Sequence, residues 1–155
     1  MPIGNLQRQR VQPGKVVRRV LDMLVGNPVL LLRHLGSTNA EWMSHLLSAP
    51  DEDARALGAT ATNEAERQRN MLRNRESVAR FACAGVEGFY FDGADGGPDY
   101  ERPVPSTPDG IMEVMLSLSD DVFNVYVLPY VLNQENFRER PQFAPPPTAD
   151  QLAKK

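Results

Sequence analysis

Hydrophobic residues recur at helical spacing in the middle of the chain. One such stripe, within residues 39–48, comprises Trp42, Met43, Leu46 and Leu47. Because residues three and four positions apart share one face of a helix, this pattern predicts a helix that buries one side. Thr38 and Glu41 have the spacing of a capping box at its start, and Pro50 ends it.

A longer helix is predicted over residues 63–84, with Asn63 as its N-terminal cap and Gly85 just beyond its end. Its apolar positions are Met71, Val78, Phe81 and Ala82. Charged side chains fill the other faces, so this helix is expected to lay a single stripe on a core.

The next segment has the composition of strands around a turn. Residues 86–92 are rich in β-forming side chains, and a glycine-rich run at 92–99 follows them. Residues 100–105 then return as the second arm of a loose hairpin.

A third helix is predicted after the hairpin. Ser106 or Thr107 caps it, and Pro108 stands in its first turn, where a proline is tolerated. Its wide apolar face consists of Ile111, Met112, Met115, Leu116 and Leu118.

Two segments have patterns that fit more than one structure. Residues 122–137 begin with a strand-like run and contain Pro129, but the paired acids Asp120 and Asp121 and a polar finish favour a helix. Residues 11–36 fit a helix, two short strands, or one of each, and that choice stays open.

These elements predict a mainly α fold: a single small helical domain over residues 29–138 with one short extended hairpin. A basic segment at 1–28 precedes the domain, and a proline-rich tail at 139–155 follows it. The tail is expected to be disordered or extended, because it buries too little to offset its ordering entropy. At 155 residues the chain can build a core without metals or disulfides.

Several classes of protein are disfavoured by the sequence. The longest apolar run, residues 29–32, is far shorter than the roughly 20 residues that cross a bilayer, and the N-terminus has no apolar signal region. The single cysteine, Cys83, excludes an internal disulfide framework and a cysteine-rich zinc site. A soluble, cytosolic protein without membrane contact is expected.

Charge is distributed unevenly, although the net charge is only −3. A basic patch near the N-terminus, without any acid among residues 1–20, consists of Arg8, Arg10, Lys15, Arg18 and Arg19. Residues 87–121 hold nine acids against Arg102 alone. Both are expected to be solvated segments, while self-association through opposite charges stays open. The patch could contact phosphates, but it has no aromatic residue for base stacking, so nucleic-acid binding is only a second alternative.

The chain offers few groups for catalysis or metal binding. His34 and His45 are eleven residues apart, which is not the spacing of a helical zinc pair. Apolar neighbours are expected to make Cys83 inert. The acidic turn lacks the oxygen ligand that an EF-hand needs at its third position, where Ala94 stands. No nucleotide-binding or nucleophile motif is found, so the chain is expected to be no enzyme and to need no metal or cofactor.

Five short stretches, spread over most of the chain, form a recognisable series. They are RHLGSTNAEW at 33–42, VARFACAGVEGF at 78–89, PVPSTP at 103–108, DDVF at 120–123 and NQENFR at 133–138. In this pattern the chain resembles the tail assembly chaperones of long-tailed bacteriophages. The resemblance implies binding rather than catalysis: such proteins coat the helical, aggregation-prone tape-measure protein and help to recruit tail-tube subunits in the cytoplasm of the infected host cell.

The resemblance also suggests which side chains contact partners. Candidates are the apolar and aromatic residues Trp42, Met112, Met115, Leu116, Tyr126 and Phe137. The same residues could instead form the protein's own core. A structural virion component, such as a tail or head–tail protein that stays in the particle, is the first alternative function.

Overall fold

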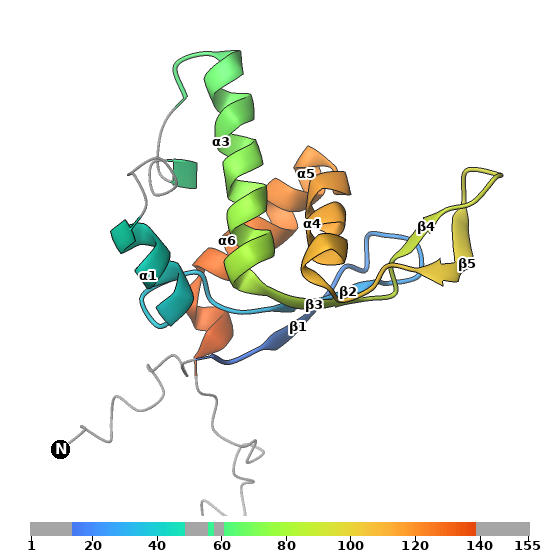
Figure 1. The fold of residues 1–155 in the computed structure, drawn as a ribbon, viewed down its shortest axis with the longest axis horizontal. Helices are drawn as coiled ribbons and strands as arrows, with labels where there is room; N and C mark the ends of the chain where they lie inside the picture. Colours follow the sequence, from blue (N-terminus) through green and yellow to red (C-terminus); the bar gives the residue numbers. More distant parts are fainter. Residues whose placement is uncertain (1–13, 49–55, 58–60, 139–155) are drawn as a thin grey trace, which may run out of the picture.

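The computed structural model describes residues 14–48, 56–57 and 61–138, and its fold is mixed α/β (Figure 1). A three-stranded and a two-stranded antiparallel sheet accompany the helices. The predicted mainly α fold with one hairpin is therefore wrong. The proline-rich tail and the cations Arg8 and Arg10 lie outside the described residues.

The three-stranded sheet holds two segments whose structure the sequence left open. Strands β1 (Val17–Val20) and β2 (Val29–Leu32) pair in antiparallel fashion, and β3 (Cys83–Glu87) pairs with the other edge of β2. Residues 11–36 thus contain two short strands. The sheet draws part of the basic segment 1–28 into the domain, since β1 belongs to it.

The sheet exists because β2 is apolar on its helix-facing side. Leu30 and Leu32 have no exposed surface, and Leu30 stands opposite Val86 of β3. The turn between β1 and β2 places Gly26 and Asn27 at φ 83° and 49°, a left-handed region that glycine and asparagine tolerate best.

The two N-terminal helices begin close to where the pattern predicts. Helix α1 (Ala40–Ser48) starts within one residue of its predicted position, but its cap is Asn39 rather than Thr38. Helix α3 (Glu64–Ser77) is capped by Asn63, as predicted, and continues as the π-helical turn η2 (Val78–Ala82). The predicted stop at Gly85 is wrong, because the chain has already entered β3 at Cys83.

The remaining helices follow the hairpin. Thr107 caps α4 (Pro108–Ser117), as one of the two predicted caps. The segment predicted as a final helix is helical in pieces: α5 (Asp120–Val122), the π-helical turn η3 (Phe123–Val127), α6 (Leu128–Leu132) and the 3₁₀ turn η4 (Gln134–Phe137). Pro129 follows η3 directly, at the point where the Leu128 N–H bonds the Phe123 carbonyl five residues earlier.

The predicted hairpin is present with a shorter first arm than residues 86–92, because Val86 and Glu87 belong to β3 of the three-stranded sheet. Strands β4 (Tyr90–Asp92) and β5 (Pro98–Pro103) pair in antiparallel fashion, and Tyr90 meets Tyr100 edge to face at 5.0 Å between ring centroids. Figure 1 shows this hairpin projecting from the body at the end opposite α1.

Helices α3, α4, α5 and α6 lie on one side of the three-stranded sheet (Figure 1). The core between these two layers is apolar and joins sheet residues such as Leu30 with helix residues such as Phe123. Its largest fully buried side chains are Phe123, Phe137, Leu21, Leu30, Leu32, Met115, Val78, Val127 and Val131.

Candidate partner-binding site

Three of the predicted partner-binding residues are part of the core. Trp42 is 2% exposed, and Met115 and Phe137 have no exposed surface. Contact between these side chains and a partner would require the core to open. Their helical spacing therefore reflects packing inside the protein, which was the alternative interpretation of the same pattern.

The other three predicted contacts are closer to solvent. Met112 is partly buried against the core, while Leu116 on α4 and Tyr126 on η3 are 44% and 36% exposed. None of the three lines the clefts described below.

The described cations of the basic patch contact the protein itself. Arg18 pairs with Glu87 at 2.8 Å, the Lys15 ammonium donates to the Arg138 carbonyl, and the Arg19 guanidinium donates to the Tyr126 carbonyl. Arg19 also lies over the Tyr130 ring, 4.5 Å from its centroid. These contacts tie β1 to the sheet and to the C-terminal helices.

The titratable groups considered for catalysis lie in structural surroundings. Burial raises the pKa of the Cys83 thiol to about 11, and its Sγ donates to the Gly85 carbonyl, so the thiol is inert as predicted. Burial lowers the pKa of His34, although a contact with the Leu132 carbonyl opposes this. The His45 ring lies 4.7 Å from the Phe81 centroid. Among the described residues, no group of three or more histidine, cysteine or acidic side chains is placed to hold a metal ion.

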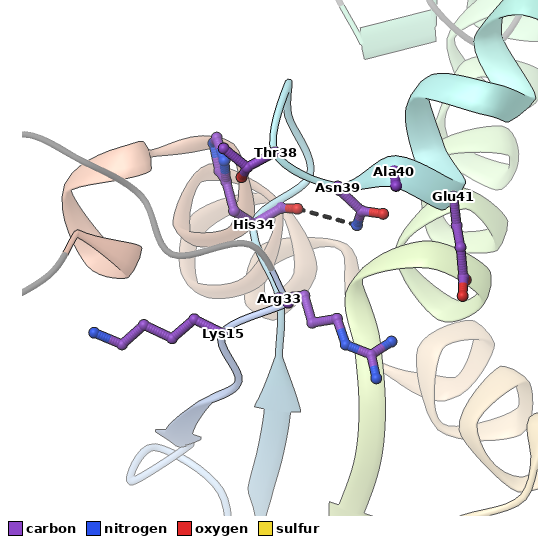
Figure 2. A pocket seen from close by; sticks show the side chains of 8 residues that line it. Lys15, Arg33, His34, Thr38, Asn39, Ala40 and Glu41 are labelled. Carbon is purple, nitrogen blue, oxygen red and sulfur yellow. Dashed lines mark hydrogen bonds between the residues drawn. The ribbon is translucent and has the colours of Figure 1, made fainter. Parts of the chain in front are cut away.

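A cleft of about 380 Å³ opens beside the start of α1 (Figure 2). Lys15, Arg33 and His34 line it, together with the first residues of the helix. Figure 2 shows the Lys15 and Arg33 side chains extending in opposite directions, so the two cations do not converge on one ligand. Asn39 binds the His34 carbonyl here, which makes this cleft a structural junction.

A larger cleft of about 460 Å³ separates the β4–β5 hairpin from α4. We name it the hairpin cleft, and its lining residues are Leu24, Phe89, Tyr90, Phe91, Asp92, Val104, Glu113, Val114, Ser117, Leu118 and Ser119. Its volume is in the range of binding pockets. Apolar side chains form most of this lining, and two carboxylates stand among them.

Another cleft at the hairpin, of about 370 Å³, lies on the side that faces the β1–β2 turn. It shares Leu24, Phe89, Tyr90 and Asp92 with the hairpin cleft. Val25 and Tyr100, which also line it, are 87% and 68% exposed. The base of the hairpin therefore presents apolar surface on both sides.

Local contacts hold the hairpin in place. The Val104 N–H donates to the Phe89 carbonyl at 2.8 Å, and Ser106 Oγ bonds both the N–H and the carbonyl of Val86 on β3. The Arg102 guanidinium lies over the Phe91 ring, 5.3 Å from its centroid. The cleft thus has a fixed outer wall, the hairpin, and a fixed inner wall, α4.

The sequence interpretation found the hairpin but assigned no partner contact to it. A usable signal was present, since four of the eleven aromatic residues, Phe89, Tyr90, Phe91 and Tyr100, flank one glycine-rich turn. The helical spacing of apolar residues favoured helix faces as the partner contacts instead, and side chains of those faces are buried in the core.

Comparisons with known proteins add no relative: no protein-family model, no curated protein and no solved structure matches the chain. Within the described part of the chain, no helix has both the length and the apolar character needed to span a membrane.

Proposed function

We propose that this chain is a tail assembly chaperone of a long-tailed bacteriophage. In this role it binds the tape-measure protein and tail-tube subunits in the cytoplasm of the infected cell while the tail is built. The observation that carries the proposal is the hairpin cleft, an open and mostly apolar groove.

The shape of the cleft supports transient binding. The cleft is open rather than enclosed, and its lining comes from the hairpin, α4 and Leu24 of the β1–β2 turn, so a client can bind and leave without the fold opening. An apolar groove with a few polar groups is a common way to hold an amphipathic helix. A chaperone needs this kind of site, because it must release its client before the particle matures.

The stretches that carry the resemblance position this groove. The 78–89 stretch runs through η2 and β3 to the foot of the hairpin, and the 103–108 stretch runs from β5 to the cap of α4. The two stretches are joined where Ser106 binds Val86. The pattern thus coincides with the segments that set the hairpin against α4.

The test is co-expression with the long coiled-coil protein encoded by the same phage. We expect this client to be soluble with the wild-type chain and to precipitate with a variant carrying Phe91→Ser and Val104→Ser, which makes both cleft positions polar. Leu47→Ser is the matched control, because Leu47 is 88% exposed on α1, far from the cleft.

Two results would overturn the proposal. One is a client that stays insoluble with the wild-type chain. The other is the presence of this chain in purified particles, which would support the alternative of a structural virion component.

A further inference from the structure

We propose that the hairpin cleft selects a basic amphipathic helix, one with lysine or arginine beside its apolar stripe. This inference rests on the proposed function, because it specifies the client chemistry at the same site. The charge, the lining and the backbone of the cleft all support this preference.

Two acidic side chains lie beside the apolar floor of the cleft. Asp92 on β4 and Glu113 on α4 line the cleft from opposite walls, and both are exposed. Further acids on the hairpin and on α4 are Asp95, Asp99, Glu101 and Asp109. The β1–β2 turn adds Asp22 and no cation. A partner with basic flanks would meet complementary charge from both walls.

Arg102 contacts the cleft lining at Phe91 and offsets part of this field, so Arg102 and the two lining carboxylates carry a formal net charge of −1. Arg102 is the sole cation among residues 87–121, and its guanidinium is stacked on Phe91. Arg18 already pairs with Glu87 on the sheet, and Arg75 pairs with Asp120 beyond the end of α4. Asp92 and Glu113 therefore remain available for a partner's cations.

The inner wall suits a helix. Glu113 and Ser117 lie one turn apart on α4 and form a short exposed stripe on the groove, while Val114 and Leu118, which also line it, are buried in the core. Ser117 is small, which leaves room for the ridge of a second helix to pack against this stripe. The volume of the cleft suits a few anchoring side chains, with the rest of the helix lying on the rim.

The backbone of the hairpin disfavours an added strand. Strand β5 begins and ends with prolines, Pro98 and Pro103, which have no N–H to donate. The register of β4 and β5 also shifts between Tyr90 and Asp92. An extended peptide would therefore find few regular hydrogen-bonding groups, whereas a helix needs none from the cleft.

The experiment measures binding of two synthetic 18-residue helical peptides to the full chain by fluorescence anisotropy. Both carry leucine at positions i, i+3, i+4 and i+7. One carries lysine and the other glutamate on the flanks of that stripe. We expect the lysine peptide to bind at least about tenfold more tightly at low salt, with the difference shrinking at high salt.

Protein variants locate the effect. Asp92→Asn together with Glu113→Gln is expected to weaken the lysine peptide about three- to tenfold and to leave the glutamate peptide no weaker. Glu76→Gln, an exposed charge on α3, is the matched control and should change neither affinity. Phe91→Ser should weaken both peptides, because it removes an apolar part of the floor.

Equal affinity for the two peptides, or no binding of either, would overturn the inference. So would a dimer of the wild-type chain that dissociates in the Asp92→Asn, Glu113→Gln variant, because a second copy would then be the occupant. If the client is rescued in co-expression but the peptides are not discriminated, the charge selection is wrong and the proposed function stands. If the peptides are discriminated but the client is not rescued, the proposed function is wrong and the cleft keeps its preference.

Discussion

At the residue scale, Arg75 joins three elements from inside the protein. Its side chain is 7% exposed, and its guanidinium donates to the carbonyls of Met115 and Leu118, each at 2.6 Å. It also pairs with Asp120 at 2.8 Å and lies 5.0 Å from the Phe123 ring centroid. The carbonyls at the end of a helix have no partner within it, so Arg75 satisfies groups that α4 leaves open.

We expect Arg75→Met to lower the free energy of unfolding by about 2–4 kcal/mol, because two buried carbonyls lose their donor. Asp120→Asn should cost less than about 1 kcal/mol, since Asp120 is 63% exposed and its ion pair is screened by water. Urea unfolding of both variants measures the difference. Similar costs would mean that the ion pair, rather than the carbonyl contacts, makes Arg75 important.

Gly110 is required by close packing rather than by backbone conformation. A Cβ at this position of α4 would lie 2.0 Å from the Pro105 carbonyl oxygen. Gly110→Ala is therefore expected to lower the melting temperature despite the better helix propensity of alanine, with a cost of about 1–3 kcal/mol. Gly97→Ala, where the nearest atom is an ordinary 3.5 Å away, is the control and should be almost neutral. A stable Gly110→Ala variant would show that the 105–110 turn can open easily.

At the element scale, Asn39 decides where α1 begins and what the helix is attached to. Its Oδ1 accepts from the Trp42 N–H, and its Nδ2 donates to the carbonyls of His34 and Phe81. The start of α1 is thereby held to the end of β2 and to η2. Trp42, one turn on, then packs 5.4 Å from the Phe81 ring.

Replacement of Asn39 by alanine is expected to lower the free energy of unfolding by about 1–3 kcal/mol, because it removes the cap and leaves a partly buried carbonyl without its donor. Thr38→Ala should lower the free energy of unfolding by only a few tenths of a kcal/mol, although Thr38 has the capping-box spacing. Thermal unfolding followed by circular dichroism compares the two. The reverse order would place the cap at Thr38 in solution.

The hairpin and the π-helical turns show which element features the sequence could predict. The hairpin follows from β-forming residues around a glycine-rich turn, and both the turn chemistry and the strands are local. The π-helical turns are different, because no local pattern of residues marks them. The Leu128 N–H reaches the Phe123 carbonyl five residues earlier, and this spacing lets the buried side chains of η3 face the core.

At the scale of the whole molecule, the end around α1 and the end around the hairpin differ in their contacts, although a cleft opens at each. Around α1, polar groups are bound to backbone and aromatic rings are packed together. Around the hairpin, apolar side chains and carboxylates are exposed on both sides of a projecting element. We therefore expect partners to bind at the hairpin end.

The pH dependence of stability tests the burial of His34 beside the start of α1. Burial holds the pKa of His34 below its ordinary value of 6.5, so the unfolded chain binds more protons between the two pKa values. The stabilising contribution is complete above pH 6.5 and is lost as the pH falls through the folded pKa. The melting temperature of the wild type should thus fall more between pH 7.5 and pH 5.5 than that of His34→Gln. Parallel curves for the two proteins would show that His34 titrates normally in the folded state.

Sequence by itself determined the local features of this protein. The caps Asn63 and Thr107, the starts of α1 and α4 and the turn of the hairpin all depend on a few neighbouring residues, whose preferences act over short range. It also determined the acidic character of residues 87–121, because charge is a property of composition, although only Asp92 and Glu113 of these nine acids line the hairpin cleft.

Only the tertiary structure decided the fold class and the site. Residues 17–20 and 29–32 became strands because β3, more than fifty residues later, pairs with β2, and no local pattern carries that information. The same packing buried Trp42, Met115 and Phe137 and left Tyr100 of the hairpin exposed and Phe89 half-buried. Helical spacing identifies the apolar face of a helix that must be buried. Long-range contacts decide whether the protein's own core or a partner buries that face.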